Sequence, residues 1–236
     1  MEISFFFPAY RDEATVEPLA RALDEVLCVN SDVHEILIVD DDSPDSSGQI
    51  ADRLAAENPR IRSIHHARNF GYGRVLLTGI RESRFEWIGF TDGDMQYDVR
   101  ELPNLIAAAR SGADIVAGYK TSRADGLKRR VSSYAYNSAI RLLTGLDLHD
   151  ADCAFKLMHR SVFEDFIPST DYKEAFLLVE AFYKAARRGA RIVQLPVSHR
   201  PRPHGESSCF SLTTARRMAW YALRGAVHGR LLGSWR

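Results

Sequence analysis

Apolar residues along this chain occur in two patterns, short runs and longer stretches in which they recur every three or four positions. The short runs are too brief for helices and predict strands over residues 3–7, 35–40, 61–65, 87–91, 114–118 and 191–195, of which the run at 61–65 is a weaker one. The helical spacing predicts helices over residues 14–29, 48–58, 75–83, 99–111, 134–143 and 173–188. A loop and a further strand are expected within residues 146–155. Strands that alternate with helices in this way predict an α/β fold with a mostly parallel sheet and helices on both faces.

Acidic turns follow the second and fourth predicted strands. Residues 40–42 read Asp-Asp-Asp and residues 92–94 read Asp-Gly-Asp. Ligands of open α/β sheets bind beyond the carboxyl ends of the strands, so both turns should face one crevice. A dinucleotide-binding Rossmann domain is the rival fold. No G-x-G-x-x-G follows the first strand, where residues 8–10 read Pro-Ala-Tyr, and this argues against that rival.

The Asp92-Gly93-Asp94 turn is the stretch with the most specific chemistry. Two carboxylates at the mouth of a buried strand repel one another unless a cation lies between them. A divalent metal that carries a diphosphate would meet that need, because Mg²⁺ and Mn²⁺ prefer hard oxygen ligands and leave room for phosphates. An ordinary Asp-Gly turn without a ligand is the alternative.

Composition excludes some classes of protein and leaves others open. The 236 residues are 45% hydrophobic, which is enough for one large α/β domain. Lys plus Arg equals Asp plus Glu at 31 each, so the net charge does not indicate a nucleic-acid partner. Three widely spaced cysteines fit neither a disulfide framework nor a zinc site and favour a reducing cytoplasm. No apolar stretch approaches the roughly 18 residues of a transmembrane helix, so a cytoplasmic protein is expected.

Two basic segments are open to more than one interpretation. Residues 119–131 hold five cations and one acid, and form either a solvated loop or a mobile loop whose cations meet phosphates. Residues 211–236 hold five arginines, no acid and an apolar stripe at helical spacing. Such a helix lies on an anionic membrane surface, which would make the protein peripheral, or packs on its own domain or a partner subunit.

Six short segments in this order resemble the inverting family 2 glycosyltransferases with the GT-A fold, and above all the polyprenyl-phosphate sugar transferases. They are residues 8–13, 38–45, 69–73, 92–96, 152–156 and 199–207. The resemblance covers about residues 1–210 and implies a GT-A domain there. Residues 211–236 are predicted, from their own apolar and basic pattern, to follow it as a basic amphipathic C-terminal helix. The family pattern has Asn at the position of Arg11 and Lys at the position of Ser208, so the match is not complete.

The resemblance also implies a role for each matching position. The nucleotide would be held by Pro8, Tyr10, Glu13, Val39, Asp41 and Asp92. Mg²⁺ or Mn²⁺ would be bound by Asp92, Asp94 and Gln96. The acceptor phosphate and the reaction centre would meet Lys120, Arg123, Arg129 and Arg202.

The implied activity is transfer of a sugar from a UDP- or GDP-sugar to a polyprenyl phosphate. An anionic phosphate can attack the anomeric carbon without a protein base, whereas a hydroxyl acceptor requires one. The candidates for that base are Asp150, Asp152 and Glu180. Two alternatives stay open, a soluble family 2 transferase that acts on a small-molecule hydroxyl and a non-catalytic sugar-nucleotide-binding protein. A homodimer is a further expectation.

Overall fold

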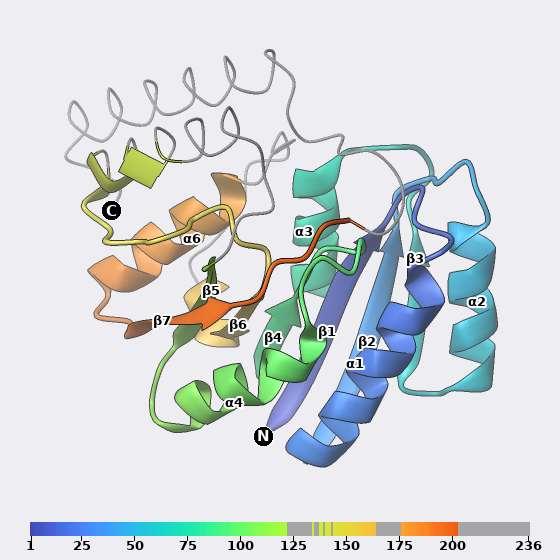
Figure 1. Ribbon diagram of the computed structural model, residues 1–236, viewed down its shortest axis with the longest axis horizontal. Coiled ribbons are helices and arrows are strands. Elements are labelled where there is room, and N and C mark those ends of the chain that lie inside the picture. The colour runs from blue at the N-terminus through green and yellow to red at the C-terminus, as the bar shows by residue number, and fades with distance from the viewer. Residues whose placement is uncertain (122–133, 135–136, 139, 143, 164–175, 203–236) are drawn as a thin grey trace.

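The chain folds into a mostly parallel sheet that is covered by helices on both faces (Figure 1). The computed structural model describes residues 1–121, 134, 137–138, 140–142, 144–163 and 176–202. Its strands are β1 (Glu2–Ala9), β2 (Val33–Asp40), β3 (Ile61–His65), β4 (Trp87–Phe90), β5 (Ile115–Lys120), β6 (Lys156–His159) and β7 (Ile192–Val197). Its helices are α1 (Val16–Asn30), α2 (Ser47–Glu57), α3 (Tyr72–Glu82), α4 (Leu102–Arg110) and α6 (Phe176–Arg187), with 3₁₀ turns at Val99–Glu101 and Arg160–Phe163.

The strand order in the sheet is β3-β2-β1-β4-β6-β5-β7. β6 runs antiparallel to both of its neighbours, β4 and β5, while the other pairs of strands are parallel. Helices α1 and α4 lie in front of the sheet in Figure 1, and α3 lies behind it. The predicted fold class is therefore confirmed. The carboxyl ends of β1, β2 and β4 lie at one edge and present their turns together.

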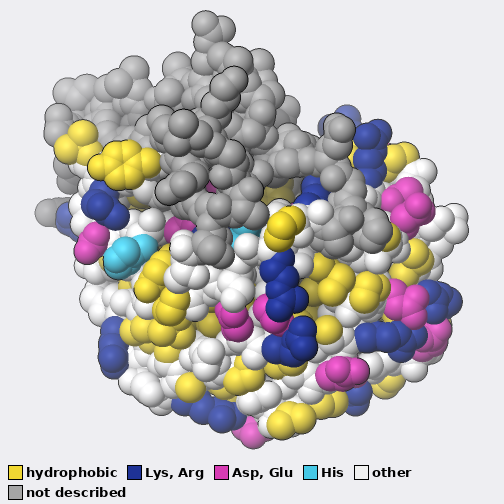
Figure 2. Space-filling model, in the orientation of Figure 1, with side chains coloured by type: hydrophobic (Ala, Val, Ile, Leu, Met, Phe, Trp, Pro, Cys, Tyr) yellow, Lys and Arg dark blue, Asp and Glu magenta, His cyan; other side chains and the backbone are white. Residues whose placement is uncertain are grey.

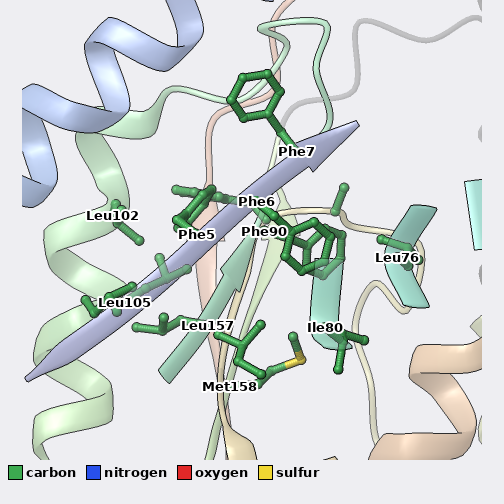
Figure 3. Close-up of a cluster of buried hydrophobic side chains, with 14 of the residues drawn as sticks. Phe5, Phe6, Phe7, Leu76, Ile80, Phe90, Leu102, Leu105, Leu157 and Met158 are labelled. Carbon is green, nitrogen blue, oxygen red and sulfur yellow. The ribbon is translucent and has the colours of Figure 1, made fainter. Parts of the chain in front are cut away.

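The middle of the sheet is apolar on both faces, because β1 is buried along most of its length. Figure 3 shows Phe5 on the side of Leu102 and Leu105 of α4. Phe6 points to the opposite face and stacks on Phe90 with ring centroids 5.5 Å apart. Alternate side chains of one strand thus enter two separate layers of core, which requires apolar residues at successive positions.

Several predicted elements differ from the structure, among them the helix expected from residue 75, which begins at Tyr72 as α3. The first strand does not stop before Pro8 but continues to Ala9 in parallel register with β2. The helix expected from residue 99 begins as a 3₁₀ turn, and α4 itself starts at Leu102. The prediction of a strand within residues 146–155 is wrong, because the strand in this part of the chain, β6, begins only at Lys156.

Lys156 explains why sequence reasoning missed β6. A lysine at the first position interrupts the apolar run that would mark a buried strand. In the structure its side chain is buried, and its ammonium lies 5.7 Å from the ring centroid of Phe90 and 5.9 Å from that of Phe182. Burial lowers the pKa of Lys156, and the two aromatic faces partly compensate for the loss of water.

The described surface carries mixed charge. Figure 2 shows acidic and basic side chains side by side over the α1–α2 region, where Arg21 and Arg53 pair with Glu17 and Glu57. Exposed pairs of this kind contribute at most about 1 kcal/mol each and mark no site. Within the described ranges, no helix is long and apolar enough to cross a membrane. Arg123, Arg129 and residues 211–236 lie outside these ranges.

Candidate functional site

The acidic turn after β4 is shaped by close packing against the end of β1. A Cβ atom added at Gly93 would lie 2.2 Å from the carbonyl oxygen of Pro8, so only glycine fits there. Met95 then adopts a left-handed conformation with a φ of 57°. The contact between the two chain segments places Asp92 and Asp94 at the carboxyl edge of the sheet, as the sequence predicted.

Asp92 lies in a half-buried position between two other functional groups. The hydroxyl of Tyr72, the first residue of α3, donates a hydrogen bond to Oδ1 of Asp92 at 2.8 Å. Burial, and next the negative charge of Asp94, raise the pKa of Asp92 to about 7. A bound cation would stabilise these two mutually repelling carboxylates, because it favours the ionised form of both.

Asp94 is buried and faces a basic side chain from a distant part of the chain. The Nε atom of Arg202 lies 3.8 Å from Oδ2 of Asp94. The Nη2 atom of the same guanidinium donates a hydrogen bond to Oδ1 of Asp12 at 2.9 Å. The structure therefore brings together two predicted residues, Asp94 and Arg202, and adds Asp12, which the sequence reasoning did not select.

Gln96 fixes the segment that carries Arg202. Its backbone N–H donates to Oδ1 of Asp94 at 3.1 Å, and its side-chain amide donates to the carbonyl of Arg200 at 2.9 Å. The backbone N–H of Arg200 returns a bond to the carbonyl of Gln96 at 2.8 Å, and Tyr97 forms an antiparallel bridge with His199. The chain after β7 is therefore tied to the acidic turn, and the side-chain amide of Gln96 contacts this segment.

The positions predicted to hold the nucleotide lie along the neighbouring strands. Pro8 and Val39 are paired across β1 and β2, and Val39 is fully buried. Tyr10 is half-buried in the loop after β1. Glu13 accepts a hydrogen bond from the backbone N–H of Ser46 at 3.1 Å. The contact between Glu13 and Ser46 joins the loop after β1 to the loop after β2 at the carboxyl edge of the sheet.

Both carboxylate oxygens of Asp41 form hydrogen bonds with other groups of the protein. Its Oδ1 lies 2.6 Å from Nδ1 of His66 and accepts from the N–H of Phe70 at 2.9 Å. Its Oδ2 accepts from the N–H of Gly71 at 2.8 Å. Tyr72 follows directly and reaches Asp92, so the acidic turns after β2 and β4 are connected through residues 70–72.

Lys120 lies beside two of the candidate bases. Its Nζ is 3.9 Å from Asp150 Oδ2 and 3.7 Å from Asp152 Oδ2. Burial works to lower the pKa of Lys120, but the carboxylates of Asp152 and Asp150 outweigh it and raise the pKa above its ordinary value. The third candidate, Glu180, is 2.9 Å from Nζ of Lys184. Each candidate base therefore has a lysine partner.

Among the residues that the structure describes, one other cluster offers groups with metal-binding chemistry. Asp24, Cys28 and His34 have potential ligand atoms within 4.8 Å of one another, at the opposite edge of the sheet. However, Arg60 donates two hydrogen bonds of 2.8 Å to the two oxygens of Asp24. The guanidinium already neutralises this carboxylate, so the cluster is an ion-paired surface feature.

Sequence reasoning missed Asp12 and Tyr72. Asp12 belongs to the matching segment 8–13, but Glu13 beside it was selected. Tyr72 belongs to the segment 69–73, and no signal in that segment indicated that its hydroxyl would reach Asp92. In both cases the missing information was a contact between residues far apart in the chain.

Comparisons with known proteins identify the family. The Glycosyl transferase family 2 model matches residues 4–167. "Glycosyltransferase AglD" of Haloferax volcanii is 32% identical over 86% of this chain and 34% of its own length. "Dodecaprenyl-phosphate galacturonate synthase" of Rhizobium johnstonii is 28% identical over 88% of this chain and 61% of its own length. The chain thus spans between a third and two thirds of these curated relatives.

Solved structures show the same fold at lower identity. Mannosyl-3-phosphoglycerate synthase from Rubrobacter xylanophilus superposes with a TM-score of 0.69 and 18% identity, over 100% of this chain and 77% of that chain. Glucosyl-3-phosphoglycerate synthase from Mycobacterium tuberculosis, in complex with Mn²⁺ and UDP, gives a TM-score of 0.68 and 18% identity over 95% and 78% of the two chains. This chain therefore belongs to glycosyl transferase family 2 and is a glycosyltransferase with a GT-A-like α/β fold.

Proposed function

We propose that this glycosyltransferase moves a sugar from a nucleoside-diphosphate donor to a polyprenyl phosphate in a metal-dependent, inverting reaction. The observation that carries the proposal is the convergence of Asp92, Asp94 and Arg202 at the carboxyl edge of the sheet. Relatives named for dodecaprenyl-phosphate and undecaprenyl-phosphate transfer, at 28% identity over 87–88% of the chain, support this acceptor.

The donor would bind with its diphosphate at the acidic turn. Asp94 and Asp92 supply the oxygen ligands that Mg²⁺ or Mn²⁺ prefers, and Gln96 is the third proposed ligand. When bound, the metal supplies Lewis-acid neutralisation of the departing diphosphate. The base and ribose would lie along Pro8, Tyr10, Glu13, Val39 and Asp41. Asp41 would contribute by holding residues 70–71 in place, because its carboxylate is bonded to them.

The acceptor phosphate would attack the anomeric carbon directly. A phosphate needs no deprotonation at neutral pH, so the protein has only to position it and balance charge. Arg202 suits this task because its planar guanidinium can bind a phosphate with two parallel hydrogen bonds. Lys120 lies at the start of the basic segment that contains Arg123 and Arg129, the other residues proposed to meet the acceptor.

The ion pairs of the candidate bases favour a phosphate acceptor over a hydroxyl. A carboxylate that removes a proton must be able to approach the hydroxyl. Asp150 and Asp152 lie beside Lys120, and Glu180 lies beside Lys184. The phosphate route needs none of these carboxylates. A hydroxyl acceptor is the second candidate. It is supported by the similar fold of glucosyl-3-phosphoglycerate synthase, whose structure was solved in complex with phosphoglyceric acid.

Three further parts of the proposal concern the whole protein. The GT-A unit is proposed to cover residues 1–210, and residues 211–236 to form a basic amphipathic helix that contacts an anionic membrane surface. Peripheral attachment would bring the enzyme to its lipid acceptor. The chain would act in the cytoplasm on that membrane face, without a nucleic-acid partner and as a homodimer.

Transfer assays with matched acceptors test the function. The full chain would be incubated with Mn²⁺ and radiolabelled UDP- or GDP-sugars, in the presence of either a polyprenyl phosphate or the corresponding polyprenol. We expect labelled lipid only with the phosphate, loss of product in Asp94→Asn, and retained product in Asp152→Asn and Glu180→Gln. Product formed from the polyprenol, and lost in one of those two variants, would instead establish the hydroxyl route.

A further inference from the structure

We propose that Asp12 is a positioning residue, which keeps Arg202 in the site when a divalent cation occupies Asp94. The inference rests on the proposed function, because it concerns the same metal site. It assigns a role to a residue that the family resemblance did not select. It also predicts that Arg202 and the metal compete for one carboxylate.

The backbone around Asp12 is firmly anchored. Its N–H donates to Oγ of Ser47 at 3.0 Å, and its carbonyl accepts from the N–H groups of Thr15 at 2.8 Å and Val16 at 3.0 Å. Its Oδ2 accepts from the N–H of Tyr10 at 3.2 Å. Asp12 is thus fixed between the end of β1 and the start of α1, and its Oδ1 has a defined position.

Arg202 shares its guanidinium between two carboxylates. It donates to Oδ1 of Asp12 at 2.9 Å, while its Nε is 3.8 Å from Oδ2 of Asp94. The side chains of Arg202, Asp12 and Asp94 are only 21%, 10% and 12% exposed, so water screens these charges weakly. The shorter contact is to Asp12, which is therefore the stronger anchor.

This geometry has a direct consequence for a cation at Asp94. The positive guanidinium repels a divalent cation that binds the same carboxylate. With the Asp12 carboxylate in place, Arg202 can yield Asp94 to the cation and remain bonded in the site. In Asp12→Asn, Asp94 becomes the stronger carboxylate attraction for Arg202, and the arginine opposes the metal more strongly.

A double-mutant cycle on metal affinity tests this account without relying on turnover. The full chain would be titrated with Mn²⁺ alone, and unbound Mn²⁺ followed by electron paramagnetic resonance. We expect Arg202→Gln to tighten Mn²⁺ binding about fivefold and Asp12→Asn to weaken it about tenfold, which is within the range of coupled pairs. In the Arg202→Gln background, Asp12→Asn should weaken binding by no more than about twofold.

Equal weakening by Asp12→Asn in both backgrounds would overturn the inference, because Asp12 would then act independently of Arg202. If Asp12→Asn does not fold, Arg202→Gln alone decides, since unchanged or weaker Mn²⁺ binding excludes competition. Asp98→Asn is the matched control. It removes one negative charge and the ion-pair partner of Arg200 on the same segment, and should leave Mn²⁺ affinity unchanged.

Asp94→Asn separates this inference from the proposed function. Mn²⁺ binding that persists in Asp94→Asn, or no binding by the wild type, would show that the proposed metal site is wrong. Binding that depends on Asp94, but with equal effects of Asp12→Asn in the two backgrounds, would overturn only the role of Asp12.

Discussion

Replacing Asp92 with asparagine should stabilise the metal-free protein above neutral pH and have little effect near pH 4. Burial and the charge of Asp94 raise the pKa of Asp92 from 3.8 to about 7 in the folded state. Between these values the folded protein keeps a proton that the unfolded chain releases, so the free energy of unfolding falls as the pH rises from about 4 to about 7. Above about pH 7 this loss is complete, because the ionised carboxylate then has to be kept in a poorly solvated site.

The size of the effect follows from the shift in the pKa of Asp92. A shift from 3.8 to about 7 is about three units, and each unit corresponds to about 1.36 kcal/mol, so the penalty at pH 8 is on the order of 4 kcal/mol. A chain of 236 residues gains about 2–4 °C in Tm for each kcal/mol. Asp92→Asn should therefore raise Tm by about 8–16 °C at pH 8.

Thermal unfolding in a chelator between pH 4 and pH 8 measures this difference. Asp147→Asn serves as the control, since that side chain is 85% exposed and its replacement makes the same change in charge. A Tm difference between Asp92→Asn and the wild type that stays constant from pH 4 to pH 8 would refute the electrostatic reasoning. Mn²⁺ at pH 8 should raise Tm of the wild type but not that of Asp92→Asn.

Two further substitutions give separate tests. Arg11 has a φ of 58°, so Arg11→Asn should increase the free energy of unfolding by about 1 kcal/mol in urea titrations; a decrease would show that the arginine side chain stabilises this loop. Tyr72→Phe removes the hydrogen bond to ionised Asp92, so the pH midpoint of Mn²⁺ binding should rise by about one unit. An unchanged midpoint would mean that this hydrogen bond does not favour the ionised form.

Much of the fold followed from local patterns. The run at residues 61–65 has the same bounds as β3, and the apolar strand at residues 35–40 lies within β2. β2 is buried along most of its length, and a strand covered on both faces requires the unbroken apolar run that the sequence shows there. The antiparallel strand β6 was missed, because a lysine does not indicate a buried strand. Lys156 is nevertheless buried there, since the aromatic rings of two other elements lie beside its ammonium.

The conformation of Arg11 gives a physical reason for the Asn that the family pattern has at this position. Its φ of 58° lies in the left-handed region, where Asn is one of the few residues other than Gly that is readily accommodated. The backbone N–H of Arg11 donates to Oγ of Ser43 at 2.8 Å, and this contact holds the loop in place. The sequence showed the substitution, and the structure shows the conformation in which it occurs.

The sequence by itself determined the α/β architecture and the acidic turn at the end of β4, because both depend on residues that are close together in the chain. Only the tertiary structure placed Arg202 between Asp12 and Asp94, since Arg202 and Asp12 are 190 residues apart. The raised pKa of Asp92 was likewise invisible in the sequence, because it depends on how completely other elements exclude water from that carboxylate. The sequence therefore shows which chemical groups are present and which elements carry them, whereas packing decides the partners and the charge of each group.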